Sequence, residues 1–275
     1  MDAAQQRWIE QNPFLEPLAR FQDTIATAAA GLDVAAPVLP PFAAHAEPFR
    51  AGVALLRGQS HGPRFAAAGG EALARLAERA AAQALPQAIA AGVVEVTGAL
   101  ATPEGRAAAM AWLLGGGPDE AAPVQAGLLR FLGWTALGRL VAPMARPWAD
   151  WRATEPWNRP TCPTCGQLPV MSQLVGREAA RDRVLVCGCC ATRWGYKRVG
   201  CPYCGNDAAD RMALLELQGS TGLRLDVCES CKGYVKTYAG QGQEALYLAD
   251  WPTLLLDAMA SERGYARRGI SLFDL

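Results

Sequence analysis

Four Cys-x-x-Cys pairs lie in the second half of this 275-residue chain and account for eight of its nine cysteines. Each pair presents two thiolates from a short turn, and two such turns together make the tetrahedral four-sulfur site that structural zinc or a single iron ion prefers. We therefore predict two metal ions per chain, iron or zinc. The predicted ligands are Cys162, Cys165, Cys187, Cys190, Cys201, Cys204, Cys228 and Cys231.

Chain order predicts which pairs share an ion. Residues 166–186 and 205–227 are stretches of similar length that can each form one hairpin, whereas residues 191–200 make a short connector. We expect the first pair to join the second and the third to join the fourth, with an interleaved pairing as the alternative. A module of about 40 residues buries too little surface to fold without a staple, and metal binding of about 10–16 kcal/mol per site supplies one.

Two of the four turns carry a further signal. In Cys162-Pro-Thr-Cys-Gly166 and Cys201-Pro-Tyr-Cys-Gly205 the proline restricts φ, and the glycine after the second cysteine can adopt a positive φ. This conformation lets backbone N–H groups point at the sulfurs, which supports a metal-bound thiolate. The turns Cys187-Gly-Cys-Cys190 and Cys228-Glu-Ser-Cys231 keep the spacing without the full signature, and Gly233 comes one residue later than expected.

Closed four-sulfur sites leave no open position for water or substrate, so we predict structural metals rather than catalytic ones. A thioredoxin-like redox enzyme needs only one reactive Cys-x-x-Cys pair, so four pairs do not match that class. A four-iron cluster does not match either, because its cysteine ligands are usually closer together in the sequence. We interpret Cys189 as a small side chain turned away from the metal; an exchangeable ligand and a redox-sensitive thiol are the alternatives. His45 and His61 fall in the first half of the chain, and we expect surface or capping roles for them.

Charge and hydropathy exclude several classes of protein. Lys+Arg and Asp+Glu are equal at 26 each, so the chain lacks the net positive charge of a general nucleic-acid or anionic-membrane binder. We expect no membrane span and no secretory signal, and hence a cytoplasmic protein. In a reducing compartment, paired cysteines are read as metal ligands rather than disulfides.

The segment from Arg177 to Arg198, which flanks the second turn on both sides, is rich in basic residues. We expect a solvated hairpin there, with a surface for an acidic partner as the alternative. The cations are Arg177, Arg181, Arg183, Arg193, Lys197 and Arg198, beside the acids Glu178 and Asp182.

Hydrophobic periodicity divides the chain into a helical domain over 1–155 and a metal-binding domain over 156–275, whose modules cover about 160–198 and 199–240. Apolar residues recur every three or four positions over 14–25, 71–85, 103–114 and 122–141, which predicts helices. Residues 168–175, 184–187, 212–217 and 223–227 have the pattern of strands, the last two joined by a turn at 219–222. A closing helix is expected over 251–262.

The ordered series of motifs over residues 160–267 resembles the formate dehydrogenase accessory protein family. The residues that carry the resemblance are Cys162-Pro-Thr-Cys-Gly-Gln-Leu-Pro, Leu185-Val-Cys-Gly-Cys-Cys-Ala-Thr-Arg-Trp194, Arg198-Val-Gly-Cys-Pro-Tyr-Cys-Gly205, Cys228-Glu-Ser-Cys-Lys-Gly-Tyr-Val-Lys236, Asp250-Trp-Pro-Thr-Leu-Leu-Leu-Asp257 and Glu262-Arg-Gly-Tyr-Ala-Arg267, with a weaker echo at Asn12-Pro-Phe-Leu. The chain departs from the family pattern at Gly195, where a histidine is frequent, and in the tail Ile270-Ser-Leu-Phe.

The resemblance implies an α+β protein: an N-terminal all-α domain, two rubredoxin-like or zinc-ribbon-like modules and a C-terminal helix. It also implies a cytoplasmic accessory protein that binds the immature catalytic subunit of formate dehydrogenase and carries iron on the eight paired cysteines. Because no catalytic motif is present, we predict that the chain is not an enzyme. A rubredoxin-like electron carrier and a zinc-ribbon nucleic-acid-binding module are the alternatives, and oligomeric state stays open.

Overall fold

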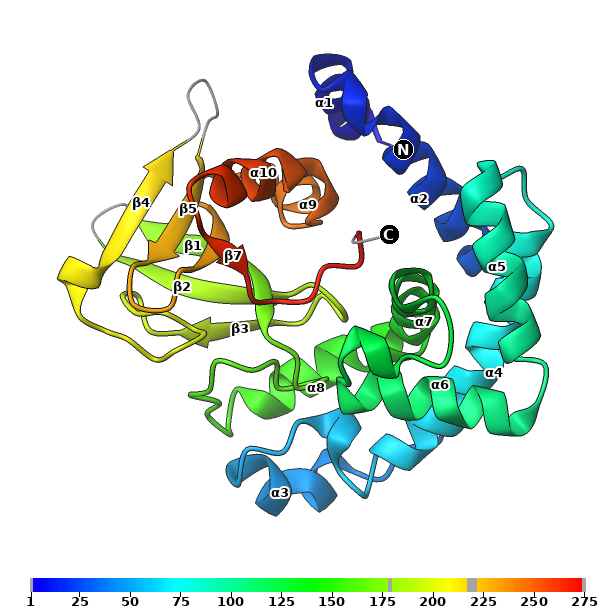
Figure 1. Ribbon diagram of the computed structural model, residues 1–275. Coiled ribbons are helices and arrows are strands. Elements are labelled where there is room, and N and C mark those ends of the chain that lie inside the picture. Colours follow the sequence, from blue (N-terminus) through cyan, green and yellow to red (C-terminus); the bar gives the residue numbers. More distant parts are fainter. Residues whose placement is uncertain (1, 178–179, 217–221, 274–275) are drawn as a thin grey trace. The chain divides into compact units, whose positions relative to one another are not determined.

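The computed structural model describes residues 2–177, 180–216 and 222–273, and the chain divides into two compact units. We call Met1–Glu16 with Trp157–Ser271 the strand-rich unit, and Pro17–Pro156 with Leu272–Leu275 the helical unit (Figure 1). Helices followed by a strand-rich region that holds all nine cysteines confirm the predicted α+β class.

The helical unit is built around α4, which packs against α5, α6 and α7. Leu73 and Leu76 of α4 and Leu129 and Leu132 of α7 are fully buried in its core. The helices of this unit are α2 (Glu16–Ala30), α3 (Ala46–Arg50), α4 (Gly62–Ala81), α5 (Gln87–Ala99), α6 (Pro103–Gly115), α7 (Ala126–Val141) and α8 (Ala145–Arg152), with short 3₁₀ turns between them.

Helix boundaries follow local signals closely where caps are strong. Thr102 accepts a hydrogen bond from the Gly105 N–H, Pro103 stands at the first helical position, and Gly116 ends α6 with a φ of 69°. The predicted helix over 103–114 is therefore confirmed almost to the residue. In contrast, α4 starts at Gly62, nine residues before the predicted start at residue 71. Gly69 lies inside this helix and packs against Met110, since a Cβ at this position would lie 2.8 Å from the Met110 Cε.

His45 and His61 are completely buried, so the expectation of a surface position was wrong. They lie at the starts of α3 and α4 without capping them. The rings contact each other edge to face, 5.7 Å between centroids, beside the stacked Trp148 and Trp151. His45 Nε2 lies 2.9 Å from the Val53 carbonyl oxygen, and burial lowers the pKa of both imidazoles. These histidines are parts of an aromatic core.

This core predicts an acid-sensitive helical unit. An imidazole whose folded pKa is lowered stabilises the fold above the unfolded pKa of about 6.5, and that contribution falls as protonation favours the unfolded chain at lower pH. We expect each histidine to lower the unfolding free energy by up to about 1.4 kcal/mol per pH unit below that pKa. Urea unfolding at pH 7.5 and 5.5 measures this, and His45→Gln is expected to have a shallower pH dependence; an equal slope in that variant would contradict the prediction.

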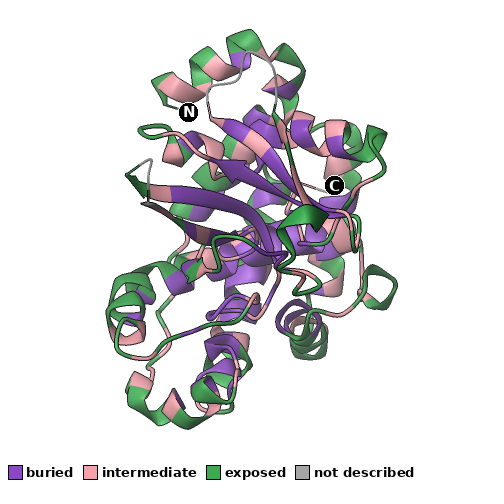
Figure 2. Cartoon of the chain, turned by 90° about the vertical axis from the view of Figure 1, so that its left-hand side faces the viewer, coloured by how far each residue is buried: buried purple, intermediate pink, exposed green. Residues whose placement is uncertain are grey.

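The strand-rich unit contains, among its described residues, one seven-stranded sheet in the order β3-β2-β1-β6-β5-β4, with β7 paired to β6 (Figure 1). The strands β1, β5 and β6 are mostly buried, whereas β3, β4 and β7 are more exposed (Figure 2). The seven strands are β1 (Pro169–Arg177), β2 (Ala180–Cys187), β3 (Arg193–Tyr196), β4 (Met212–Glu216), β5 (Leu223–Cys228), β6 (Gly233–Tyr238) and β7 (Ala266–Arg267). Leu217 and residues 219–221 of the predicted turn lie outside the described residues.

The sheet consists of two antiparallel halves, β1–β2–β3 and β4–β5–β6, each following one Cys-x-x-Cys turn and interrupted by another. The halves meet through a parallel pairing of β1 with β6, in which Ser172 lies opposite Thr237. Their hydroxyls are 2.7 Å apart, and Thr237 donates to Asp226 Oδ2 at 2.9 Å. The two modules therefore share one sheet.

Helices cover the second half of this sheet. α10 (Leu254–Glu262), which follows a 3₁₀ turn at Trp251–Thr253, packs Leu256 and Ala260 against β5 and β6, so the closing helix is confirmed. α1 (Ala3–Gln11) belongs to this unit: its Trp8 indole donates to the Pro252 carbonyl at 2.9 Å and meets the Tyr247 ring edge to face. Tyr247 ends α9 (Glu244–Tyr247). No described helix is long and apolar enough to cross a bilayer.

Candidate metal centres

The structure brings the eight paired cysteines together in two groups of four, within each of which the four sulfur atoms lie within 4.8 Å of one another. We call Cys162, Cys165, Cys187 and Cys190 site 1. Sulfur–sulfur distances there are 3.5 Å between Cys162 and Cys190 and 3.4 Å between Cys165 and Cys187. A zinc tetrahedron with bonds of about 2.3 Å has edges of about 3.8 Å, so the pocket has room for one ion.

Site 2 consists of Cys201, Cys204, Cys228 and Cys231, in which Cys228 ends β5 as Cys187 of site 1 ends β2. Cys201 and Cys231 are 3.7 Å apart at their sulfurs, as are Cys204 and Cys228. These distances match the edges of the same tetrahedron. Both sets are grouped in chain order and not interleaved.

All four turns share one backbone conformation, although only two carry the glycine signature. The residue after the second cysteine is left-handed in each: Gly166 at φ 78°, Ala191 at 56°, Gly205 at 76° and Lys232 at 55°. The Thr164 and Tyr203 N–H groups each donate to the first sulfur of their turn at 3.4 Å. Ala191 and Lys232 accept a strain of about 1–2 kcal/mol that glycine would avoid, and no spacing rule could have revealed this.

The protonation states of site 1 indicate that its sulfurs need a cation. Burial acts to raise the pKa of the Cys162 thiol, but hydrogen bonds from Cys165, Cys187 and Cys190 lower it well below the usual value. Burial raises the pKa of those three partners well above theirs. One thiolate among three thiols is thus favoured without metal, and four adjacent thiolates require a positive charge between them.

At site 2, burial also opposes ionisation of the thiols while hydrogen bonds favour it, although these cysteines are less buried than those of site 1. Burial raises the pKa of the Cys201 thiol to about 12, although backbone N–H groups of Cys204 and Tyr203 oppose the shift. Burial also acts against ionisation of Cys228, but the N–H groups of Cys231 and Ser230 lower its pKa overall. Peptide dipoles therefore support negative sulfur at both sites, as thiolate ligands require.

Cys189 is buried in the turn between Cys187 and Cys190 and lies outside both groups. The structure gives it no position among the four sulfurs of site 1. Its alternative role as a redox-sensitive thiol stays a hypothesis.

The basic segment is less solvated than expected. Arg183 is only 2% exposed and donates to the Gly200 carbonyl at 2.8 Å, with Asp226 at 3.4 Å. Arg181 donates to the Ala239 carbonyl, so it holds the sheet together. The prediction of a solvated hairpin was wrong for Arg183 because β2 lies between β1 and β3, and the Arg183 side chain is buried beside Asp226. Glu178 lies outside the described residues.

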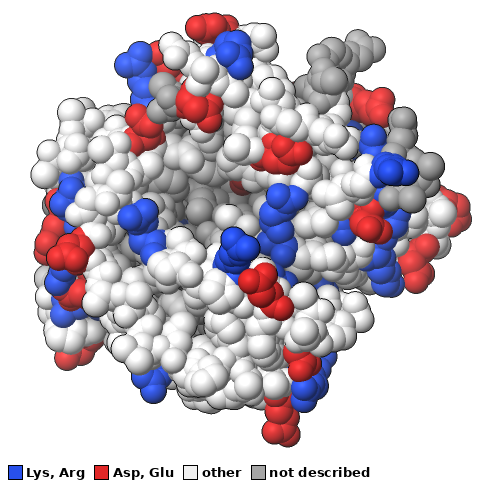
Figure 3. All heavy atoms as spheres, turned by 180° about the vertical axis from the view of Figure 1, so that it is seen from behind, with Lys and Arg blue, Asp and Glu red and all other residues white. Residues whose placement is uncertain are grey.

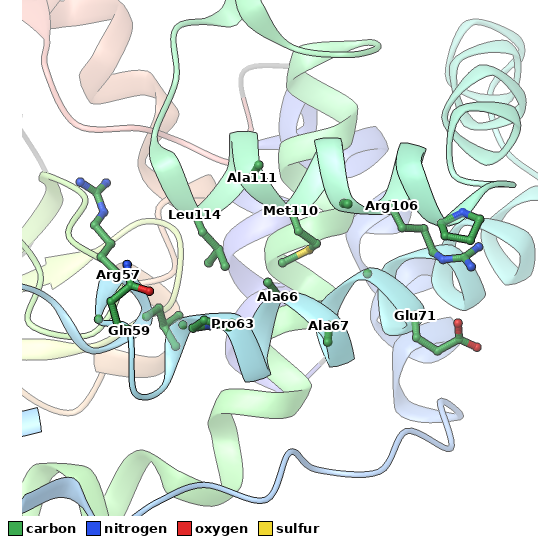
Figure 4. Close-up of a pocket in the computed structure, with 16 residues that line it drawn as sticks. Arg57, Gln59, Pro63, Ala66, Ala67, Glu71, Arg106, Met110, Ala111 and Leu114 are labelled. Carbon is green, nitrogen blue, oxygen red and sulfur yellow. The ribbon is translucent and has the colours of Figure 1, made fainter. Parts of the chain in front are cut away.

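The helical unit has a groove of about 520 Å³ between α4 and α6 (Figure 4). Its middle is lined by small or apolar side chains, including Ala66, Ala111 and Met110. Charged side chains stand toward its ends, where Arg106 donates to the Leu100 carbonyl and Glu71 pairs with Arg75. These interactions tie the charged groups to the helices, and the groove contains none of the predicted site residues.

Comparison with known proteins agrees with this architecture. Residues 161–198, which hold site 1, match the family described as FdhE, central domain. A protein named Protein FdhE homolog from Pseudomonas aeruginosa is 31% identical over 185 residues, covering 62% of this chain and 56% of that protein, and one from Shewanella baltica is 31% identical over 138 residues, covering 48% and 44%. The chain is similar to FdhE proteins. It spans about half the length of these curated relatives.

The structural similarity covers more of the chain than the sequence similarity does. The crystal structure of the FdhE protein from Pseudomonas aeruginosa aligns with a TM-score of 0.58 and 24% identity, over 94% of this chain and 87% of that one. Helices followed by a strand-rich region are therefore an arrangement that this FdhE-like chain shares with a solved structure.

Proposed function

We propose that this chain is an accessory protein for the maturation of formate dehydrogenase, and that it binds the immature catalytic subunit. The observation that carries the proposal is the FdhE central-domain match, because it covers the segment whose four cysteines form site 1. An accessory protein needs rigid surfaces rather than a reaction centre, and two closed four-sulfur sites supply rigidity.

We infer in addition that the eight paired cysteines bind two metal ions, iron or zinc. Thiolate sets of four suit either ion, since both accept tetrahedral sulfur coordination. The metal, when bound, would supply the positive charge that four thiolates need and would clamp each pair of turns. In this proposal the protein acts in the cytoplasm and has no catalytic residues.

The nucleic-acid alternative is disfavoured by the surface. On the face seen in Figure 3, Lys and Arg side chains are interspersed with Asp and Glu, and its described residues form no continuous basic area. Nucleic-acid binding depends on such an area, because phosphate neutralisation supplies most of the affinity.

A pull-down of the catalytic subunit tests the proposal. Wild-type protein is expected to retain the immature subunit, and the double variant Cys162→Ser/Cys165→Ser to lose most of that retention because one of its rigid turns is no longer clamped. Cys189→Ser is the matched control, since this buried thiol lies outside both sites. Failure of the wild type to retain the subunit would contradict the proposed function. Equal retention by the double variant would show that binding of the subunit does not need an intact site 1.

A further inference from the structure

The two sites differ in how much of each is open to solvent. At site 1, Cys162 and Cys165 are both completely buried. At site 2 the equivalent first cysteine, Cys201, is buried, but the second, Cys204, is exposed. Cys190 of site 1 and Cys231 of site 2 are both partly buried, so the two sites differ most at Cys204, the ligand residue that a chelator or thiol reagent can approach most directly.

Neighbouring segments account for the difference by covering the turns of site 1. Trp194 donates to the Arg159 carbonyl at 3.1 Å, which holds the segment before Cys162 in place. The tail covers the second turn so closely that a Cβ on Gly188 would lie 2.4 Å from the Ile270 carbonyl oxygen. The tail also reaches the second turn of site 2, where Arg268 donates to the Cys231 carbonyl at 2.8 Å, but the first turn there is open, since a Cβ on Gly205 would meet no atom within 4 Å.

Site 1 also has a side-chain hydrogen bond to one of its sulfurs that site 2 lacks at the equivalent position. Two residues after Cys190, the Thr192 hydroxyl lies 3.2 Å from the Cys190 sulfur and 2.8 Å from the Thr164 hydroxyl. A thiolate can only accept, so this hydroxyl would donate to it when metal is bound. The equivalent position at site 2 is Gly233, which has no side chain to offer. Outer contacts of this kind change metal affinity by about 10–100-fold.

We propose that site 2 is the site at which this chain loads and releases its metal, while site 1 holds its ion permanently. The inference rests on the proposed assignment of eight cysteine ligands and adds a division of labour between the two groups. Cys204 is the sulfur through which exchange begins, because it is the exposed member of its group. A protein organised in this way keeps the module of site 1 clamped while the metal of site 2 is exchanged.

Zinc release from the zinc-loaded full chain tests the proposal. With excess 4-(2-pyridylazo)resorcinol, whose absorbance reports freed zinc, we expect one equivalent to leave at least about 10-fold faster than the other. Alkylation with N-ethylmaleimide during the fast phase, followed by peptide mass mapping, is expected to modify Cys204 first and to spare Cys162 and Cys165. A single phase, or modification of site 1 first, would overturn the proposal.

Matched serine variants locate each phase. Cys204→Ser is expected to bind one equivalent of zinc, which leaves slowly, because site 1 is intact. Cys165→Ser, at the equivalent place in site 1, is expected to lose the slow equivalent; if that variant does not fold, wild-type mass mapping still decides. A wild-type stoichiometry below two would instead contradict the ligand assignment, and none of these results depends on retention of the catalytic subunit.

Discussion

Complete removal of both metal ions is expected to unfold the strand-rich unit while the helical unit keeps its helices. Each ion contributes about 10–16 kcal/mol, and a folded domain has only about 5–15 kcal/mol of net stability. Without a cation, the buried sulfurs of site 1 cannot all stay ionised, because burial raises the pKa of the Cys165, Cys187 and Cys190 thiols, and both turns of each site lose their clamp. The helical unit has an independent apolar core around α4 and contains no cysteine.

Prolonged chelation under reducing conditions provides the measurement. Far-UV circular dichroism is expected to retain its helical signal, while limited proteolysis degrades the strand-rich unit and leaves a fragment close to residues 17–156. Zinc added back to the intact full chain should restore resistance to the protease. Metal-free protein with an unchanged proteolysis pattern would show that the metals do not hold this unit together.

Replacement of Lys236 by methionine is expected to destabilise the strand-rich unit by about 3–5 kcal/mol. Lys236 lies on β6, is 1% exposed, and its ammonium contacts Asp250 and, at 2.8 Å, Asp257 Oδ2. Methionine has a similar volume but leaves the buried Asp250 without its ammonium partner, and leaves Asp257 with Arg267, at 3.5 Å, as its cationic partner. The loss therefore comes from charge desolvation, not from a cavity.

The pH dependence distinguishes this mechanism. Burial acts to raise the pKa of Asp250, but Lys236 and the Ser271 hydroxyl lower it, so its stabilising effect is present above the unfolded pKa of about 3.9 and is lost as pH falls through the folded value. In Lys236→Met the opposite trend is expected, since protonation relieves the buried charge.

Lys197→Met removes an exposed pair with Asp207 and is the control, expected to change stability by about 0–1 kcal/mol. Urea unfolding of the metal-loaded variants between pH 5 and 8 measures both: in this window the wild-type contribution of Asp250 is fully present, and only Lys236→Met is expected to gain stability as pH falls. Equal losses in the two variants would contradict the assigned role of the Lys236 cluster.

Local sequence predicted much of this molecule because the decisive interactions are close along the chain. The cap at Thr102 and the glycine at 116 delimit α6, and the hairpins β1–β2 and β4–β5 connect neighbouring strands. The cysteines group in chain order for the same reason, because each hairpin brings the Cys-x-x-Cys turn before it and the one after it to the same end of the hairpin. Their role as metal ligands stays a prediction until zinc or iron is measured.

Other features depend on contacts between distant segments. Gly69 lies inside α4, before the predicted start of that helix, and accommodates Met110 of another helix. Arg183 was expected in a solvated hairpin but is buried beside Asp226, and Lys236 is buried beside Asp250 and Asp257. Polar residues can be placed in a core only when their partners are known, and those partners lie up to 43 positions away.

The sequence by itself determined the helical and strand-rich halves and the four cysteine turns, because backbone preferences, caps and two-residue spacings act within a few residues. Only the tertiary structure decided that β1 and β6 pair in parallel to join two modules in one sheet, and that one site is covered while the other exposes Cys204. The physical reason is that parallel pairing and burial by the tail bring together residues that are far apart in the chain. Hydrophobic periodicity describes only neighbouring residues and therefore does not predict such contacts.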